Sequence, residues 1–169
     1  HQDAKYIGLE PNNWVSAWVA ITDSHEENGC MKMWPNSHLE VKDHHQSFNE
    51  GNLLTRGQTI KGVPENKLKL VELKAGQVSL HHPRIVHGSG INKSNDRRIG
   101  FVIQSYIGTN VRQTLGKNGV QIARGVDKFN FHEKIGRPNL LMDKDDLELK
   151  KKENDNLQEI FYKGSKKKG

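Results

Sequence analysis

The sequence has little of several features, and each shortage excludes a class of protein. Its 169 residues include one cysteine, Cys30, so an internal disulfide is impossible and a disulfide-stapled secreted scaffold is excluded. A reducing, cytoplasmic setting is therefore expected. No apolar run approaches the length of a membrane span, so no membrane partner is expected. The length fits a single core and leaves no room for a second catalytic domain.

Both the first 140 residues and the tail carry charges of mixed sign. The net charge is +6, with 18 Lys and Arg against 13 Asp and Glu in residues 1–140, and 8 against 7 in residues 141–169. The lysine-rich tail is thus a mixed-charge segment, and no nucleic-acid partner is expected. The chain opens with His1 rather than methionine, which predicts a fragment or a processed form.

Short runs of β-branched and aromatic residues, bounded by turn residues, predict strands. The runs cover residues 13–22, 30–34, 68–73, 77–82 and 98–107. The run at 13–22 has no breaker inside, which is typical of a strand buried on both sides. The short connection at residues 74–76 predicts that 68–73 and 77–82 are antiparallel neighbours.

Helical spacing of apolar residues is found near the C-terminus, where it predicts a helix over 145–162. Residues 38–66 are polar and irregular, which is typical of a long surface loop or substrate lid. Many strands and almost no earlier helix predict an all-β jelly-roll domain over 1–140. A charged, partly helical tail is expected over 141–169.

Three separated residues have the chemistry of a metal site. In extended backbone, residues two apart point the same way, so His1 and Asp3 can face one ion. His87 lies where a predicted strand ends and can supply a third donor. Two His and one carboxylate form the facial triad of non-haem Fe(II) oxygenases. Arg98, on a strand face with Gly100, can bind a carboxylate through two parallel hydrogen bonds.

The segments that carry these residues resemble the phytanoyl-CoA dioxygenase family of Fe(II)- and 2-oxoglutarate-dependent oxygenases. Residues 111–113 and 123–127 resemble the bacterial branch of that family. The matching pieces, in the family's order, are His1-Gln2-Asp3, Trp18 within residues 16–20, Asn28-Gly29-Cys30 with residues 35–38, residues 74–77, and His87-Gly88-Ser89-Gly90 with Asn92 and Arg98. They cover about residues 1–107.

The resemblance implies a double-stranded β-helix that uses Fe(II), 2-oxoglutarate and O2 on a small organic substrate. By the same resemblance, His1, Asp3 and His87 are the catalytic iron ligands, Arg98 binds the distal carboxylate of 2-oxoglutarate, and Ser89 and Trp18 help to hold it. The carboxylate of Asp3 favours hydroxylation over chlorination. Family members have a substantial region before the H-x-D motif, so the resemblance also implies a jelly roll truncated at its N-terminus.

The sequence also allows two other functions. An N-terminal histidine can clamp copper through its imidazole and α-amine, although this leaves Asp3 and Arg98 unexplained. A jelly-roll binding or scaffold domain without catalytic activity is the second alternative. The remaining histidines are expected to be surface or loop residues: His25, His38, His44, His45, His81, His82 and His132. Cys30 is expected to be a small buried apolar residue.

Overall fold

The computed structural model describes residues 1–46, 58–141 and 143–164, which form two compact units. The first unit contains residues 1–5, 12–46 and 58–107. The second contains the described residues of 6–11 and 108–164.

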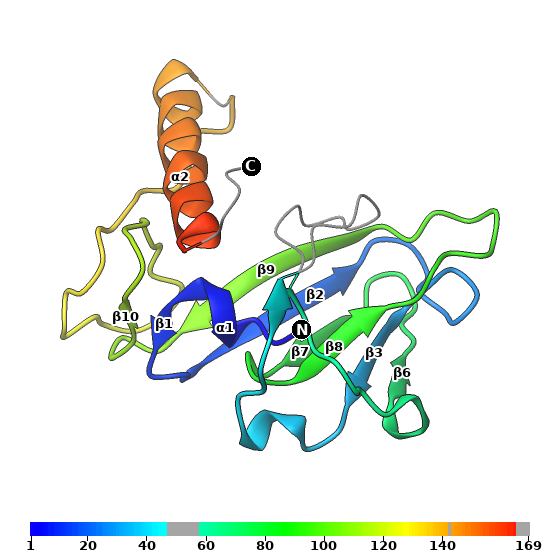
Figure 1. The fold of residues 1–169 in the computed structure, drawn as a ribbon. Helices are drawn as coiled ribbons and strands as arrows, with labels where there is room; N and C mark the ends of the chain where they lie inside the picture. The colour runs from blue at the N-terminus through cyan, green and yellow to red at the C-terminus, as the bar shows by residue number, and fades with distance from the viewer. Residues whose placement is uncertain (47–57, 142, 165–169) are drawn as a thin grey trace. The chain divides into compact units, whose positions relative to one another are not determined.

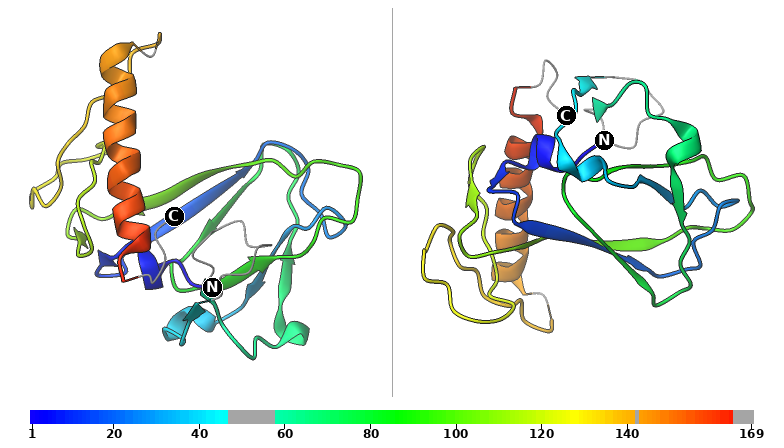
Figure 2. Two further views of the ribbon diagram at one scale, coloured as in Figure 1. Left: turned by 45° about the horizontal axis from the view of Figure 1, so that its top comes forward. Right: turned by 90° about the horizontal axis from the view of Figure 1, so that it is seen from below.

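The first unit is built from two three-stranded sheets, and every strand pairing in them is antiparallel (Figure 1). One sheet has the order β7 (Val78–His81), β2 (Trp14–Ala20), β9 (Gly100–Ile107). The other has the order β6 (Lys69–Val71), β3 (Met31–Trp34), β8 (Val86–Ser89). Figure 2 shows both sheets from two further directions. The antiparallel sheets and the C-terminal helix confirm the predicted all-β jelly-roll class.

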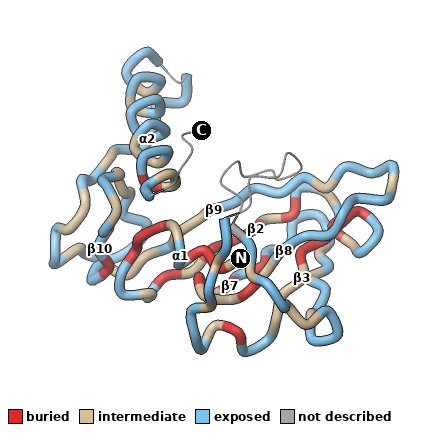
Figure 3. The backbone as a smooth tube through the Cα atoms, viewed as in Figure 1, coloured by how far each residue is buried: buried red, intermediate tan, exposed pale blue. Residues whose placement is uncertain are grey.

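The core of this unit lies between the two sheets. Five of the seven residues of β2 are buried, and two of them, Trp18 and Ala20, pack against Met31 of β3. Figure 3 marks the buried stretches of the chain in red. Met33 and Val71, from the second sheet, complete the contact. Because side chains of a strand alternate between its faces, the same face of β2 that builds the core also carries Ser16 into the interior.

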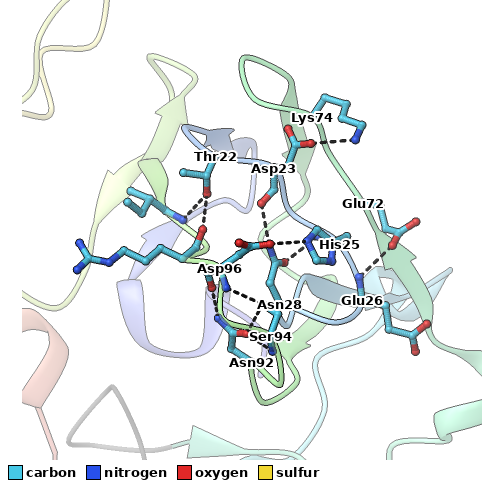
Figure 4. A network of polar contacts seen from close by, with 12 residues as sticks. Thr22, Asp23, His25, Glu26, Asn28, Glu72, Lys74, Asn92, Ser94 and Asp96 are labelled. Atoms are coloured by element: carbon cyan, nitrogen blue, oxygen red, sulfur yellow. Dashed lines mark hydrogen bonds and ion pairs between the residues drawn. The ribbon is translucent and has the colours of Figure 1, made fainter.

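The predicted pairing of residues 68–73 with 77–82 is wrong. β6 pairs with β3, whereas β7 pairs with β2 in the other sheet. The connection between them therefore passes from one sheet to the other, with Gly76 at a φ of 85°. The carboxylate of Asp23 accepts hydrogen bonds from Ala75 N and Lys74 Nζ, both at 2.8 Å, and so fixes this crossing. Figure 4 shows the contact between Asp23 and Lys74.

The predicted long loop at 38–66 has some regular structure. Two 3-10 turns, η1 (Ser37–Leu39) and η2 (Glu65–Lys67), lie at its ends. Between them, β4 (His45–Gln46) and β5 (Gln58–Thr59) pair antiparallel. Residues 47–57, the middle of the predicted loop, lie outside the described residues.

A short helical turn, α1 (Ala4–Ile7), follows Asp3. In the second unit, β1 (Leu9–Glu10) pairs with β10 (Arg112–Gln113), and α2 (Lys144–Tyr162) is the long helix. The helix predicted over 145–162 is therefore confirmed, and Ile160 is its buried residue. In the described parts of the chain, no helix combines the length and apolar content needed to cross a membrane.

Candidate metal centre

Three side chains from distant parts of the chain converge on one point in the first unit. His1, Asp3 and His87 each offer a donor atom, and these atoms all lie within 4.8 Å of one another. Asp3 Oδ1 lies 3.4 Å from His1 Nε2 and 3.8 Å from His87 Nε2. The two imidazole rings meet edge to face, with centroids 4.4 Å apart. The sequence-predicted donor set is thus brought together, with both Nε2 atoms directed at one carboxylate.

The backbone holds the two histidines in register. The amide N–H of His87 donates to the carbonyl of His1 at 3.0 Å, and the α-amine of His1 donates to the carbonyl of His87 at 2.9 Å. On its other side, β8 pairs with β3, where His87 lies opposite Met33.

The ring of His87 is oriented by its second nitrogen. Nδ1 donates to the carbonyl of Ile85 at 3.0 Å, which leaves the Nε2 lone pair directed at the centre. Burial lowers the pKa of His87 to about 4, and the negative charge of Asp3 offsets this effect only in part. At neutral pH the imidazole is therefore uncharged, as a metal ligand must be.

Asp3 is buried beside β2, where the hydroxyl of Ser16 lies 3.3 Å from Oδ2. Burial by itself raises the pKa of Asp3. The hydrogen bond with His1 and the favourable charges of His87 and His1 outweigh burial and hold this pKa at about 2. The carboxylate is consequently ionised at neutral pH and ready to bind a cation.

The three residues predicted to hold a cosubstrate also lie together. Arg98 Nη2 donates to Ser89 Oγ at 3.3 Å, and its Cζ lies 5.6 Å from the ring centre of Trp18. A Cβ atom at Gly100 would overlap the indole of Trp18, so a glycine there leaves room for that ring. Arg98 itself precedes β9, which begins two residues later than the predicted strand.

Three further residues around the centre were not predicted from the sequence. His81, expected at the surface, is 8% exposed on β7, with its ring centroid 5.3 Å from that of His87. That prediction is wrong, because His81 lies across from Ser16 on the inner face of the sheet. Gln2 is fully buried, and its backbone N–H donates to His44 Nε2 at 2.9 Å. Strand alternation from Ser79 to His81 was the available signal for His81; Gln2 and His44 had none.

An antiparallel jelly roll that brings two imidazoles and one carboxylate to a point has the architecture of a mononuclear metal-binding protein. Comparison with known families agrees with that class: the phytanoyl-CoA dioxygenase (PhyH) family matches residues 1–100. The chain belongs to this family.

Similar proteins include oxygenases from animals and bacteria. The human peroxisomal phytanoyl-CoA dioxygenase is 32% identical over 101 residues, which cover 58% of this chain and 30% of the human protein. A probable alpha-ketoglutarate-dependent hypophosphite dioxygenase of Stutzerimonas stutzeri is 27% identical over 119 residues, 69% of this chain and 41% of that protein. The chain thus spans about a third of the length of the curated relatives that it matches.

Solved structures extend the similarity beyond the matched family segment. The apo form of the non-heme monooxygenase ThoJ has a TM-score of 0.81 at 30% identity, covering 95% of this chain and 58% of that chain. EvdO2 from Micromonospora carbonacea, complexed with 2-oxoglutarate, has a TM-score of 0.51 at 26% identity, covering 60% of this chain and 42% of that one.

Proposed function

We propose that the chain forms the metal and cosubstrate centre of a non-haem Fe(II)- and 2-oxoglutarate-dependent dioxygenase. The observation that carries this proposal is the convergence of His1, Asp3 and His87, whose donor atoms lie within 4.8 Å of one another. Two imidazoles and one carboxylate on one side of an ion leave open positions for a chelating cosubstrate and for O2. The proposed reaction is hydroxylation of an unactivated C–H bond in a small organic molecule.

The chemistry of the donor set fits a ferrous ion. Imidazole nitrogen suits Fe, Ni, Cu and Zn, whereas Ca²⁺ and Mg²⁺ prefer sites built from oxygen alone. His87 presents Nε2 because its Nδ1–H is held by the Ile85 carbonyl. ThoJ has also been solved as a nickel complex, at 29% identity and a TM-score of 0.74, which supports a site for a divalent transition metal here.

Arg98 would bind the distal carboxylate of 2-oxoglutarate. Its guanidinium can form two parallel, charge-assisted hydrogen bonds with a carboxylate. Ser89, which already accepts a hydrogen bond from Arg98, would share that carboxylate, and the indole of Trp18 would limit its position. The complex of EvdO2 with 2-oxoglutarate supports this choice of cosubstrate.

The bound iron would supply the redox chemistry, by which R–H, 2-oxoglutarate and O2 give R–OH, succinate and CO2. The residues of this chain would orient the reactants and exclude water. Asp3 occupies a ligand position that a chloride would otherwise need, which favours hydroxylation over chlorination. Its ionised carboxylate and the uncharged His87 would hold the cation without a change of protonation at neutral pH.

The test is anaerobic binding of Fe(II) and 2-oxoglutarate, followed by the metal-to-ligand absorption band. The parent chain is expected to develop the band, and both Asp3→Ala and His87→Ala are expected to lose it. Arg98→Ala should keep Fe(II) binding and weaken the binding of 2-oxoglutarate by at least tenfold. Asp96→Ala, at an exposed loop residue, and His25→Ala, at a half-buried one, serve as controls outside the donor set. An unchanged band in Asp3→Ala and His87→Ala would overturn the assignment.

A further inference from the structure

Gln2 lies between the two proposed ligands of the N-terminal tripeptide, His1 and Asp3, and its side chain takes part in four hydrogen bonds. Gln2 is fully buried, and burying an amide without hydrogen bonds costs several kcal/mol. Its Nε2 donates to the carbonyls of Glu40 at 2.9 Å, Arg84 at 2.5 Å and Ser37 at 3.4 Å. Its Oε1 accepts from the N–H of Lys42 at 2.8 Å.

These contacts settle which way round the amide lies. Three carbonyl oxygens surround Nε2 and one N–H faces Oε1, so the opposite orientation would set oxygen against oxygen three times. The side chain is therefore held from two directions. One is the turn at Arg84 that leads into β8 and His87, and the other is the segment 37–44.

The backbone of Gln2 is held by the same segment. Its N–H donates to His44 Nε2 at 2.9 Å, and His44 Nδ1 lies 2.8 Å from the carbonyl of Lys42. Because a backbone N–H is only a donor, His44 Nε2 must be the acceptor, and Nδ1–H then donates to Lys42. Gln2 and His44 thus lock residues 37–44 onto the tripeptide through main-chain and side-chain bonds together.

From these contacts we propose that Gln2 is a positioning residue, which holds His1 and Asp3 in register with His87 and ties their geometry to segment 37–44. The inference rests on the proposed function, because the geometry that Gln2 fixes is that of the metal ligands. The side chains of His1 and Asp3 point to the centre, whereas the side chain of Gln2 points to the carbonyls of residues 37, 40 and 84. Removing such a support typically weakens metal binding 10- to 100-fold.

The same segment also lines a cavity. Residues 40–43 and His45, with Ile60 and Lys61, line a cavity of about 380 Å³. The network therefore joins the wall of the cavity to the metal ligands over a path of hydrogen bonds in the first unit.

The probe is Co(II), whose visible absorption reports the geometry of its ligands and whose titration gives a Kd without turnover. Gln2→Glu keeps the shape of the side chain but faces three carbonyls with an acceptor. It is expected to weaken Co(II) binding at least tenfold and to shift the absorption bands. Gln113→Glu is the matched control, since its amide also spans a carbonyl and an N–H, those of Ile7 and Leu115, in the second unit.

A second pair of variants leaves the tripeptide unchanged, in case Gln2→Glu fails to fold. His44→Ala removes the acceptor for the Gln2 N–H and is expected to shift the Co(II) bands and raise the Kd several-fold. His45→Ala changes the exposed residue just beyond segment 37–44 and is expected to leave both as in the parent.

The outcomes separate the two proposals. If the parent chain binds Co(II) and His44→Ala matches it in Kd and bands, Gln2 and His44 do not position the centre, and this inference alone fails. If the parent chain does not bind Co(II), the proposed function fails at its first step and the positioning role falls with it. Equal band shifts in His44→Ala and His45→Ala would also overturn the inference, because the effect would then not follow the hydrogen bond.

Discussion

At the scale of single residues, His87 combines two properties that pull its protonation in opposite directions. It is buried beside a carboxylate, and burial has the larger effect, so its pKa is lowered to about 4 from 6.5. The unfolded chain therefore binds a proton at His87 at a higher pH than the folded chain. In the metal-free chain, the contribution of His87 to the free energy of unfolding is fully present above pH 6.5 and is lost as the pH falls toward 4.

We predict that His87→Gln flattens the acid side of the stability profile. Between pH 6.5 and 4 the parent is expected to lose a contribution that approaches about 3 kcal/mol, and the variant lacks this loss. Urea unfolding of the metal-free chain at several pH values measures it. His25→Gln, at a half-buried histidine outside the metal centre, is the control. Identical slopes in all three proteins would show that His87 does not titrate as described.

Gly100 supports a second prediction at this scale. A Cβ there would overlap the Trp18 indole, and overpacking of this kind costs about 1–3 kcal/mol. Gly100→Ala is therefore expected to destabilise the chain by that amount and to shift the tryptophan emission. Gly90→Ala is the control, because its Cβ would meet nothing within 4 Å. Equal free energies of unfolding for the two variants would contradict the packing argument.

The residues that sequence alone could predict are those with an unusual pairing of types. His1 and Asp3 stand two apart, and His87 and Arg98 stand out because an inward histidine or arginine needs a partner. The structure places the three donors together; their role as iron ligands stays a prediction. Gln2 could not be predicted, because its importance lies in carbonyls of residues 37, 40 and 84, which carry no sequence signal.

At the scale of elements, α2 begins at a defined cap. Asp143 accepts from the N–H of Asp146 at 3.1 Å, and its second oxygen accepts from Asn139 Nδ2 at 2.7 Å. An acidic first turn, Asp145 and Asp146, also suits the positive end of the helix. The periodicity of apolar residues predicted the start of the helix to within one residue, and the structure adds the cap that fixes it.

We predict that Asp143→Ala frays the start of α2 and lowers stability by about 1 kcal/mol. Far-UV circular dichroism during thermal unfolding measures this as a fall in Tm of roughly 2–4 °C. Asp155→Ala, an exposed change in the middle of the helix, is expected to have a smaller effect. A Tm equal to that of the parent would mean that the cap does not stabilise the helix.

Strand neighbours were less predictable than the strands themselves. β2, β3 and β9 follow from β-branched and aromatic runs. The short connection after β6 favoured a hairpin, whereas Asp23 and Gly76 turn the chain into the opposite sheet. Local residue preferences report that a turn occurs, but the partner of each strand depends on which sheet buries its apolar face. That information resides in long-range packing of Trp18, Met31 and Val71.

At the scale of the whole molecule, metal binding and stability are linked by mass action. An ion that binds the folded chain and not the unfolded chain adds about 2.7 kcal/mol at a concentration of 100 Kd. Anaerobic Fe(II), or Co(II) in its place, is expected to raise the Tm by roughly 5–10 °C. Asp3→Ala is expected to show no such rise. A rise of the same size in Asp3→Ala would indicate that the ion binds elsewhere.

The reciprocal main-chain bonds of His1 and His87 join residues 86 positions apart in the sequence. A contact of that span closes only after the strands between its ends have assembled, since loop-closure entropy opposes it earlier. An ion bound by both histidines would therefore bind only at the end of folding. It would lower the unfolding rate far more than it would raise the folding rate, so the stability that it adds would be mainly kinetic.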